Sequence, residues 1–131
     1  MRVYVAGLYS RTPDGKVAGI IDALHNMQVG MRVATELLIV GHVPFCPWLD
    51  YQFFLMLREG ESIPMDSIKA YSMEWLKVSE AILMLPGWEG SAGAKAELEE
   101  ARRFGLPEFY SKEDFLRYAE RVIAEPYEGQ P

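Results

Sequence analysis

Residues 84–101, MLPGWEGSAGAKAELEEA, hold the densest group of residues in this chain that could do chemistry. Gly87, Gly90 and Gly93 let the backbone approach a ligand closely or adopt positive φ. Ser91 is a natural N-cap, and the free N–H groups at the start of the helix that follows favour an anion. Glu97 lies one turn inside that helix. Its carboxylate is therefore a candidate to face a ligand bound at the start of the helix.

A second interpretation of the same stretch is a solvated acidic surface. Glu97, Glu99 and Glu100 can be favoured near a helix N-terminus by the helix dipole alone. A glycine-rich turn before a helix is also common, and this one matches neither G-x-G-x-x-G nor a P-loop. Helix physics alone leaves both interpretations open.

Strands and helices are expected to alternate along the chain. The apolar runs predict strands at residues 2–6, in HVPFCP (42–47), in AILMLPG (81–87) and in LPEFY (106–110). Helices are predicted from about Val17 to Val40, within 61–80, over 91–105 and over 112–125, whereas 48–60 is aromatic-rich and either helical or irregular. The first helix is expected to bury Ile20, Leu24, Met27, Met31, Ala34 and Leu38, and the second Ile68, Tyr71, Trp75 and Val78.

This alternation predicts a single α/β domain over residues 1–125, followed by a tail at 126–131. The expected architecture is an open, mostly parallel sheet of four to five strands flanked by helices, of the Rossmann or flavodoxin-like kind. Ligands of such sheets bind outside the carboxyl ends of the strands. The loops after Gly7, after 44–47 and after Gly87 are therefore the expected site.

Composition excludes several classes of function. The formal net charge of −6 argues against a nucleic-acid partner, which needs clustered Lys and Arg. A single cysteine, Cys46, excludes an internal disulfide and a thiolate metal cluster, and the two histidines resemble no metal site. No apolar run is long enough to span a membrane, and the chain starts directly with a strand-like segment. We expect a cytoplasmic protein without a metal or cofactor.

The segment AILMLPGWEGSAGAKAELEEARRFGLP resembles the signature of the nucleoside 2-deoxyribosyltransferase-like superfamily. It is most similar to an uncharacterised branch of small proteins with the pattern LPGW-x-x-S-x-GA-x-x-E-x-x-x-A-x-x-x-G-x-P. The resemblance extends over about residues 2–107, through VYVAGLYS and GHVPFCP, but its specific motif is confined to 84–107. The positions that fit are Leu85, Pro86, Gly87, Trp88, Ser91, Gly93, Ala94, Glu97, Ala101, Gly105 and Pro107.

The resemblance implies cleavage of an N-glycosidic bond in a (deoxy)nucleoside or its 5′-monophosphate. Glu97 matches the family glutamate that attacks the anomeric carbon and releases the base, and Ser91 matches a phosphate-binding serine of the hydrolase members. A carboxylate suits this step because it stabilises an oxocarbenium-like centre and forms a glycosyl ester. The sugar would then pass to water or to another base. The resemblance also implies a homo-oligomer, a dimer or larger.

The chain departs from the family at the second carboxylate. Ser72 stands where the family usually has an aspartate, about 25 residues ahead of the glutamate. A leaving base normally needs a general acid, and Asp50, Asp66 or Glu74 are the candidates to replace it. After the first strand, Gly7 is followed by Leu8 where the hydrolases have serine, which leaves Tyr9 and Ser10 as candidate ligand contacts.

The remaining candidates follow from position. Trp88 is expected either to stack on a base or to pack its loop, and Asp50 follows a strand end together with Trp48 and Tyr51. Tyr4 is expected in the core, and Cys46 is expected to be buried and inert. The candidate substrate-binding residues are Gly7, Tyr9, Ser10, Asp50, Ser72, Trp88, Ser91 and Gly93, with Glu97 catalytic.

Two alternatives accompany the enzyme hypothesis. A nucleotide-binding or sensing domain that has lost its chemistry is favoured by Ser72 at the acid position. A phosphoribohydrolase-like enzyme is also possible, because PGWEGSAGAKAE resembles the P-G-G-x-G-T-x-x-E motif of that family. Trp88 replaces its second glycine and the chain is short for that family, so this alternative ranks lower.

Overall fold

A computed structural model describes residues 1–124 of the chain. Four strands form one parallel sheet in the order β2-β1-β3-β4, where β1 is Arg2–Ala6, β2 Val43–Phe45, β3 Ala81–Met84 and β4 Glu108–Phe109. This confirms the predicted open α/β architecture. The predicted tail at 126–131 lies outside the described residues.

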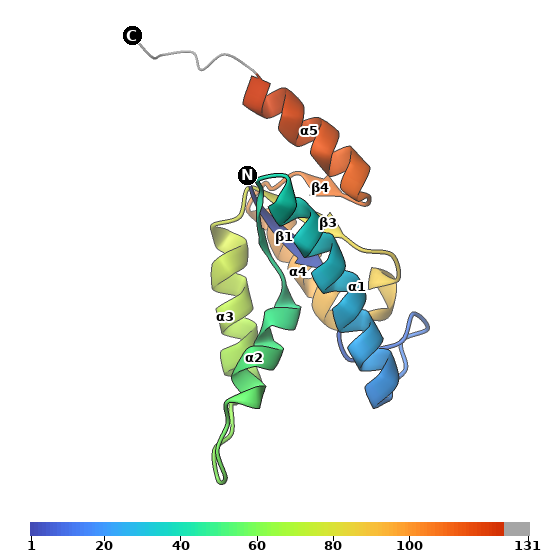
Figure 1. The fold of residues 1–131 in the computed structure, drawn as a ribbon, viewed down its shortest axis with the longest axis vertical. Helices are drawn as coiled ribbons and strands as arrows, with labels where there is room; N and C mark the ends of the chain where they lie inside the picture. Colours follow the sequence, from blue (N-terminus) through green and yellow to red (C-terminus); the bar gives the residue numbers. More distant parts are fainter. Residues whose placement is uncertain (125–131) are drawn as a thin grey trace.

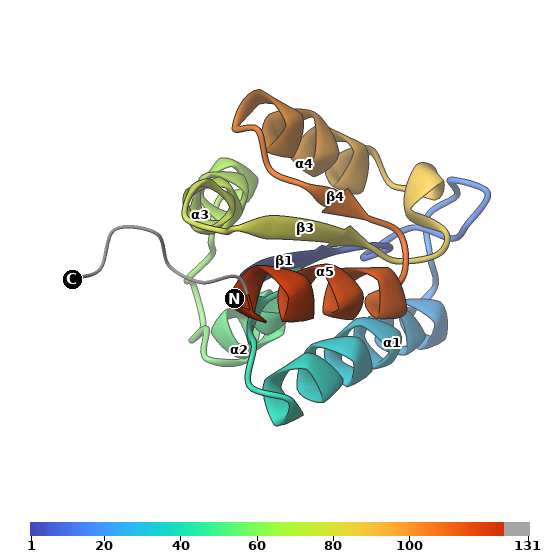
Figure 2. The same ribbon diagram turned by 90° about the horizontal axis from the view of Figure 1, so that it is seen from above.

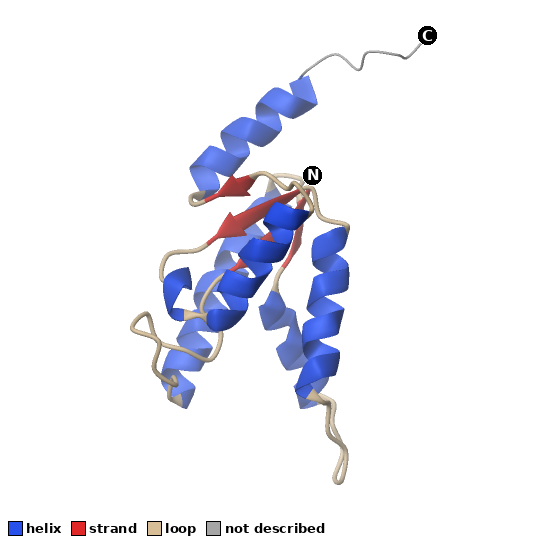
Figure 3. Cartoon of the chain, turned by 180° about the vertical axis from the view of Figure 1, so that it is seen from behind, coloured by secondary structure: helices blue, strands red, loops and turns tan. Residues whose placement is uncertain are grey.

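Helices cover both faces of the sheet (Figures 1 and 2). The two helices α1 (Ile20–Ile39) and α5 (Lys112–Ala124) lie on one face, and α3 (Met65–Lys77) and α4 (Ala92–Arg103) lie on the other. Figure 3 shows the same layers from behind, with the strands between the helices. The aromatic segment after β2 forms a short 3-10 turn, η1 (Pro47–Leu49), and the helix α2 (Asp50–Leu55). A second turn, η2 (Trp88–Gly90), precedes α4.

The side chains of β1 alternate between two cores. Val3 and Val5 pack with Leu37 of α1 and Phe115 of α5, whereas Tyr4 and Ala6 face α3 and α4. This alternation is the period of two that every strand imposes. The two central strands, β1 and β3, are buried on both faces, which explains why they read as continuous apolar runs.

The predicted buried faces of two helices are partly wrong. In α1, Met27, Met31 and Ala34 face the core as expected, but Leu37 is buried and Leu38 is 63% exposed. Ile20 and Leu24 are exposed as well, and the helix begins at Ile20 rather than Val17. The reason is that α1 carries apolar residues on more than one side, so several stripes fit its sequence.

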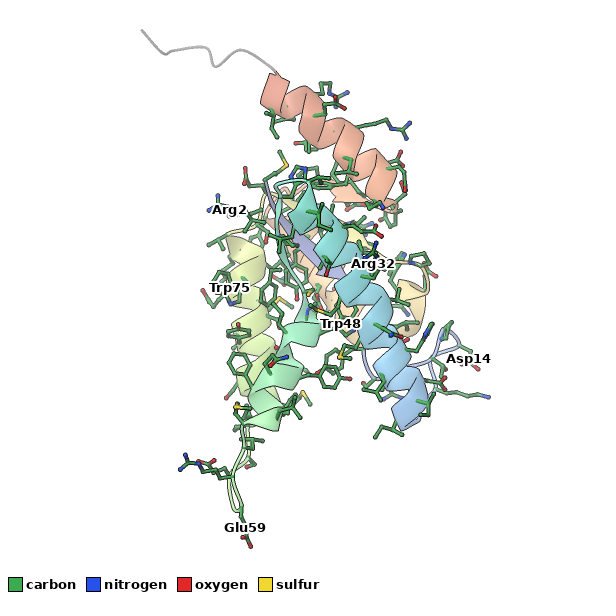
Figure 4. All side chains as sticks on the ribbon, viewed as in Figure 1. Arg2, Asp14, Arg32, Trp48, Glu59 and Trp75 are labelled. Carbon is green, nitrogen blue, oxygen red and sulfur yellow. The ribbon has the colours of Figure 1, made fainter. Side chains whose placement is uncertain are left out.

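In α3 the predicted face is displaced around the helix axis. Ser72 and Leu76 are its buried residues, whereas Trp75 and Val78 are exposed and Ile68 and Tyr71 are half-buried. Trp75 stacks on Phe45 and lies on the outer side of α3 (Figure 4). None of the described helices is long and apolar enough to cross a membrane.

The sheet order creates a topological switch point between β1 and β3. The crossover from β1 leads through α1 to β2 on one side, and the crossover from β3 leads through α4 to β4 on the other side. The two loops therefore diverge at the carboxyl ends of β1 and β3. Such a position is where ligands of open α/β sheets bind.

Candidate functional site

The loops after β1 and β3 pack closely against each other. A Cβ atom at Gly90 would lie 2.6 Å from the carbonyl oxygens of Thr12 and Pro13, and one at Gly87 would lie 2.8 Å from Leu8 Cδ1. Gly87 also has a φ of 90°, which L side chains rarely adopt. The glycines of the motif therefore serve first to bring these two loops together.

The start of α4 has the geometry that the sequence predicts. Ser91 is buried at the N-cap, and its Oγ accepts a hydrogen bond from Ala94 N at 3.1 Å. A Cβ atom at Gly93 would lie 3.7 Å from Ser91 Oγ and 4.0 Å from Glu97 Oε1. The carboxyl group of Glu97 thus reaches back toward the first turn of its own helix.

Glu97 is not a freely solvated charge. The residue is half-buried, and its Oε2 is buried without a hydrogen-bond partner. The pKa of this carboxyl is raised to about 7: burial is the main cause, the Tyr4 hydroxyl opposes the rise, and the charge of Asp50 adds to it. The interpretation of 97, 99 and 100 as one solvated acidic turn is therefore wrong for Glu97, although Glu99 is exposed.

Tyr4 is the residue that sequence reasoning did not place in the site. Its position in the core is confirmed, but its buried hydroxyl lies within reach of Glu97 and Ser72 and interacts with both. Neither contact has the distance and angle of a hydrogen bond, so the Tyr4 hydroxyl has no hydrogen-bond partner. Burial first, and the neighbouring Glu97 second, hold the pKa of Tyr4 well above its usual range. The only signal in the sequence was a hydroxyl-bearing residue inside an otherwise aliphatic strand.

Asp50, the first residue of α2, joins Tyr4 and Glu97 to form a group that we call the carboxyl cluster. The residue is 2% exposed, and its Oδ1 is buried with no hydrogen-bond partner. Burial raises the pKa of Asp50 to about 6. Tyr4 Oη, Asp50 Oδ1 and Glu97 Oε2 are the three buried side-chain polar atoms without a partner among the described residues. They come from β1, from the first residue of α2 and from α4, whereas buried polar groups are normally paired.

Two tyrosines flank Asp50. The rings of Tyr9 and Tyr51 stack with their centroids 5.2 Å apart. Burial, Tyr51 and then Asp50 all raise the pKa of Tyr9. Tyr9, predicted as a ligand contact, is thus close enough to Asp50 to feel its charge.

The other predicted site residues have structural partners. Gly7 is buried, and a Cβ atom there would lie 3.1 Å from Leu85 Cβ and 3.4 Å from the Trp48 ring. Trp88 is half-buried and packs against Tyr110, with ring centroids 6.0 Å apart. Ser10 is exposed at the base of the loop that follows β1, where its carbonyl accepts a hydrogen bond from Ala18 N. Their roles toward a ligand stay predictions.

A separate pocket lies on the α1 side of the sheet. It has a volume of about 280 Å³, and none of the predicted site residues lines it. Trp48 forms part of its wall and donates a hydrogen bond from Nε1 to Leu8 O at 3.0 Å (Figure 4). Its polar lining residues are Thr12, Asp22, His25 and Asn26. The carboxyl cluster is the stronger candidate site. It holds the buried side-chain polar atoms without partners in the described part of the chain, and none of these belongs to a residue that lines the pocket.

The described residues contain no group of three or more His, Cys, Asp or Glu side chains that could hold a metal ion. Cys46 is buried as expected, and burial raises the pKa of its thiol to about 11. The chemistry that the site can support is that of two carboxyl groups and a phenol in a poorly hydrated space. Such a site can transfer protons and stabilise positive charge.

Comparison with known proteins yields a family. No curated protein matches the chain. Residues 1–110 match the family model described as a domain of unknown function, DUF4406, and this range contains Tyr4, Asp50 and Glu97. The match covers well over half of the chain, so the protein belongs to the DUF4406 family.

Proposed function

We propose that this protein cleaves the N-glycosidic bond of a (deoxy)nucleoside or nucleoside 5′-monophosphate, with Glu97 as the nucleophile. The observation that carries the proposal is the burial of Glu97 Oε2 without a partner, beside Tyr4 and within the electrostatic reach of Asp50. A carboxylate oxygen without a hydrogen-bond partner has a free lone pair, which attack on an anomeric carbon needs. The motif resemblance of residues 84–107 supports the same reaction.

The start of α4 suits a phosphorylated substrate. The first-turn N–H groups of Ala92 and Gly93 have no partner within the helix, whereas Ala94 N donates to Ser91 Oγ. The side chains of Ser91 and Glu97 both lie beside Gly93. A 5′-phosphate held there would place the attached sugar near the carboxyl cluster. We therefore expect the monophosphate to be a better substrate than the free nucleoside.

The proposal also includes a homo-oligomer. Large apolar side chains are exposed on α2, α3 and the connection between them, among them Phe53, Leu55, Met56, Trp75 and Val78. Exposed apolar patches commonly mark contacts with other chains. Light scattering of the purified protein measures this directly.

A panel of nucleosides and 5′-monophosphates, ribo and deoxy, with and without an acceptor base, tests the enzymatic function. We expect the wild type to release free base from at least one deoxy compound. Glu97→Gln should lower this release by at least about 10³-fold, because the nucleophile is lost. Glu99→Gln on the exposed side of the same helix is the matched control and should release base like the wild type.

The same panel separates the alternatives. Ser72 is buried near the Tyr4 hydroxyl, at the position where the superfamily that the motif resembles usually has an aspartate. This favours a binding or sensing domain as the second candidate. Ligand binding without base release by the wild type would establish that candidate instead. Release confined to ribonucleoside monophosphates would favour the phosphoribohydrolase-like alternative.

A further inference from the structure

Asp50 is the one Asp or Glu of the described chain that is buried as a whole residue, and nothing in its surroundings neutralises it. Its Oδ1 accepts no hydrogen bond. The residue directly follows η1, so its backbone is held by the turn that also places Trp48 in the interior. Asp50 is therefore a buried carboxyl group, held in place by the turn before it, with an oxygen that no other group uses.

Asp50 and Glu97 both lie close enough to Tyr4 for their charges to act on its hydroxyl. Tyr4 is in the strand between β2 and β3, aligned with Phe45 on one side and Ile82 on the other. The charge of Asp50 acts on both Tyr4 and Glu97. The two carboxyl groups therefore belong to one electrostatic unit, although 47 positions separate them in the sequence.

The other candidates for a second carboxyl group point away from this unit. Asp66 and Glu74 of α3 are exposed, and Glu74 forms an ion pair with Lys77 at 2.9 Å. Position 72 of the same helix carries a serine. The acid function that α3 would be expected to supply is thus absent from α3 and can come from the end of β2 instead.

We propose that Asp50 is the proton donor to the leaving base, replacing the carboxyl group that Ser72 lacks. This proposal rests on the proposed function, since it assigns the acid of the same glycosidic reaction. It makes the loop after β2, rather than α3, the source of the second catalytic residue.

The step balances with the groups present. A Glu97 carboxylate oxygen bonds to the anomeric carbon while the bond from that carbon to the base nitrogen breaks. The electron pair stays on the base, which takes the proton of Asp50. In the second step a water oxygen bonds to the anomeric carbon, one water proton returns to Asp50, and the ester bond breaks with its electrons on Glu97. An acceptor base can replace this water.

Electrostatics couples the two carboxyl groups. The reaction needs Glu97 ionised and Asp50 protonated. Burial raises the pKa of both carboxyls, and the charge of Asp50 adds to the rise at Glu97, so a proton on Asp50 favours ionisation of Glu97. A positioned general acid contributes roughly 10²–10⁴-fold to the rate.

The test compares leaving groups that do and do not need a proton. One substrate is the natural nucleotide that the wild type cleaves, and the other is the same sugar phosphate linked to 4-nitrophenol, which leaves as a stable anion. Asp50→Asn should lower kcat/KM for the nucleotide by about 10²–10⁴-fold and for the nitrophenyl compound by less than about tenfold. If Asp50 supplies the proton, kcat/KM of the wild type for the nucleotide should decline at high pH, and Asp50→Asn should lose this decline. Glu97→Gln should cleave neither substrate. Asp66→Asn changes an exposed aspartate of α3 and should cleave both substrates like the wild type.

Two results would overturn the assignment while leaving the proposed function intact. In the first, Asp50→Asn cleaves the nucleotide as fast as the wild type. In the second, it loses both substrates equally, which means that Asp50 holds the fold or the sugar rather than the proton. If the wild type cleaves neither substrate, the proposed function itself is wrong, and the acid role falls with it.

Discussion

At the scale of single residues, the site is a group of polar side chains kept at a cost in stability. Leaving a buried polar group without a partner costs about 1–3 kcal/mol, and Tyr4, Asp50 and Glu97 each have such an atom. The total stability of a domain is only about 5–15 kcal/mol. A ligand that supplies the missing partners would recover part of this cost on binding.

The raised pKa values of Asp50 and Glu97 predict how stability depends on pH. Both carboxyls titrate at higher pH in the folded chain than in the unfolded chain, so the folded state binds more protons between about pH 4 and 7. The free energy of unfolding attributable to them therefore falls as the pH rises through this window. Glu97→Gln removes the part of this fall that is due to Glu97.

We expect Glu97→Gln to be more stable than the wild type by about 1–3 kcal/mol at pH 8 and equal to it near pH 4. Urea unfolding of both proteins across this range measures the difference, and Glu99→Gln is the control. Taking the difference cancels the titration of other groups, such as His42, whose pKa burial lowers. If the free energy of unfolding depends on pH in the same way in Glu97→Gln and in the wild type, Glu97 is not a buried carboxyl with a raised pKa.

At the scale of secondary-structure elements, the packing of α1 against η1 fixes the position of Asp50. Gly30 of α1 faces the Trp48 ring so closely that a Cβ atom there would overlap the ring. Trp48 precedes Asp50 by two residues and is 2% exposed. The glycine in the middle of a long helix is therefore explained by close approach rather than by flexibility.

Gly30→Ala tests this contact. Alanine favours a helix over glycine by about 1 kcal/mol, but overpacking a core costs about 1–3 kcal/mol. Because the Trp48 ring cannot move without displacing η1, we expect a net loss of about 1–2 kcal/mol in the free energy of unfolding. Gln28→Ala, at an exposed position of α1, should change it by less than about 0.5 kcal/mol. A more stable Gly30→Ala protein would show that the ring does not pack there.

The elements also show what sequence patterns can and cannot predict. The order of strands and helices followed from apolar runs bounded by Gly and Pro. Ser111 precedes α5 and accepts a hydrogen bond from Asp114 N at 3.1 Å, a pairing typical of a helix start. The buried faces of α1 and α3 could not be chosen, because apolar residues lie on several sides of each helix. Which stripe is buried depends on the sheet that it meets, as Leu37 and Leu38 illustrate.

At the scale of the whole molecule, the strand order is what assembles the site. The motif alone was enough to propose Glu97 as the nucleophile. Asp50 was one of three carboxyl residues proposed to replace the missing acid. Only the structure shows that Tyr4 is aligned with Phe45 of β2 and Ile82 of β3, and that Asp50 is buried whereas Asp66 and Glu74 are exposed. Tyr4 itself could not be found, since a buried strand residue reads as core until the sheet places its hydroxyl beside α4.

The most direct test of the central claim is the carboxyl titration of Glu97, followed by ¹³C NMR in the wild type and in Asp50→Asn. We expect a pKa near 7 in the wild type, because burial and the Asp50 charge both raise it. We expect a lower pKa in Asp50→Asn, where that charge is gone. A pKa near the ordinary value of about 4.3 in both proteins would show that Glu97 is a solvated surface charge and would contradict the site.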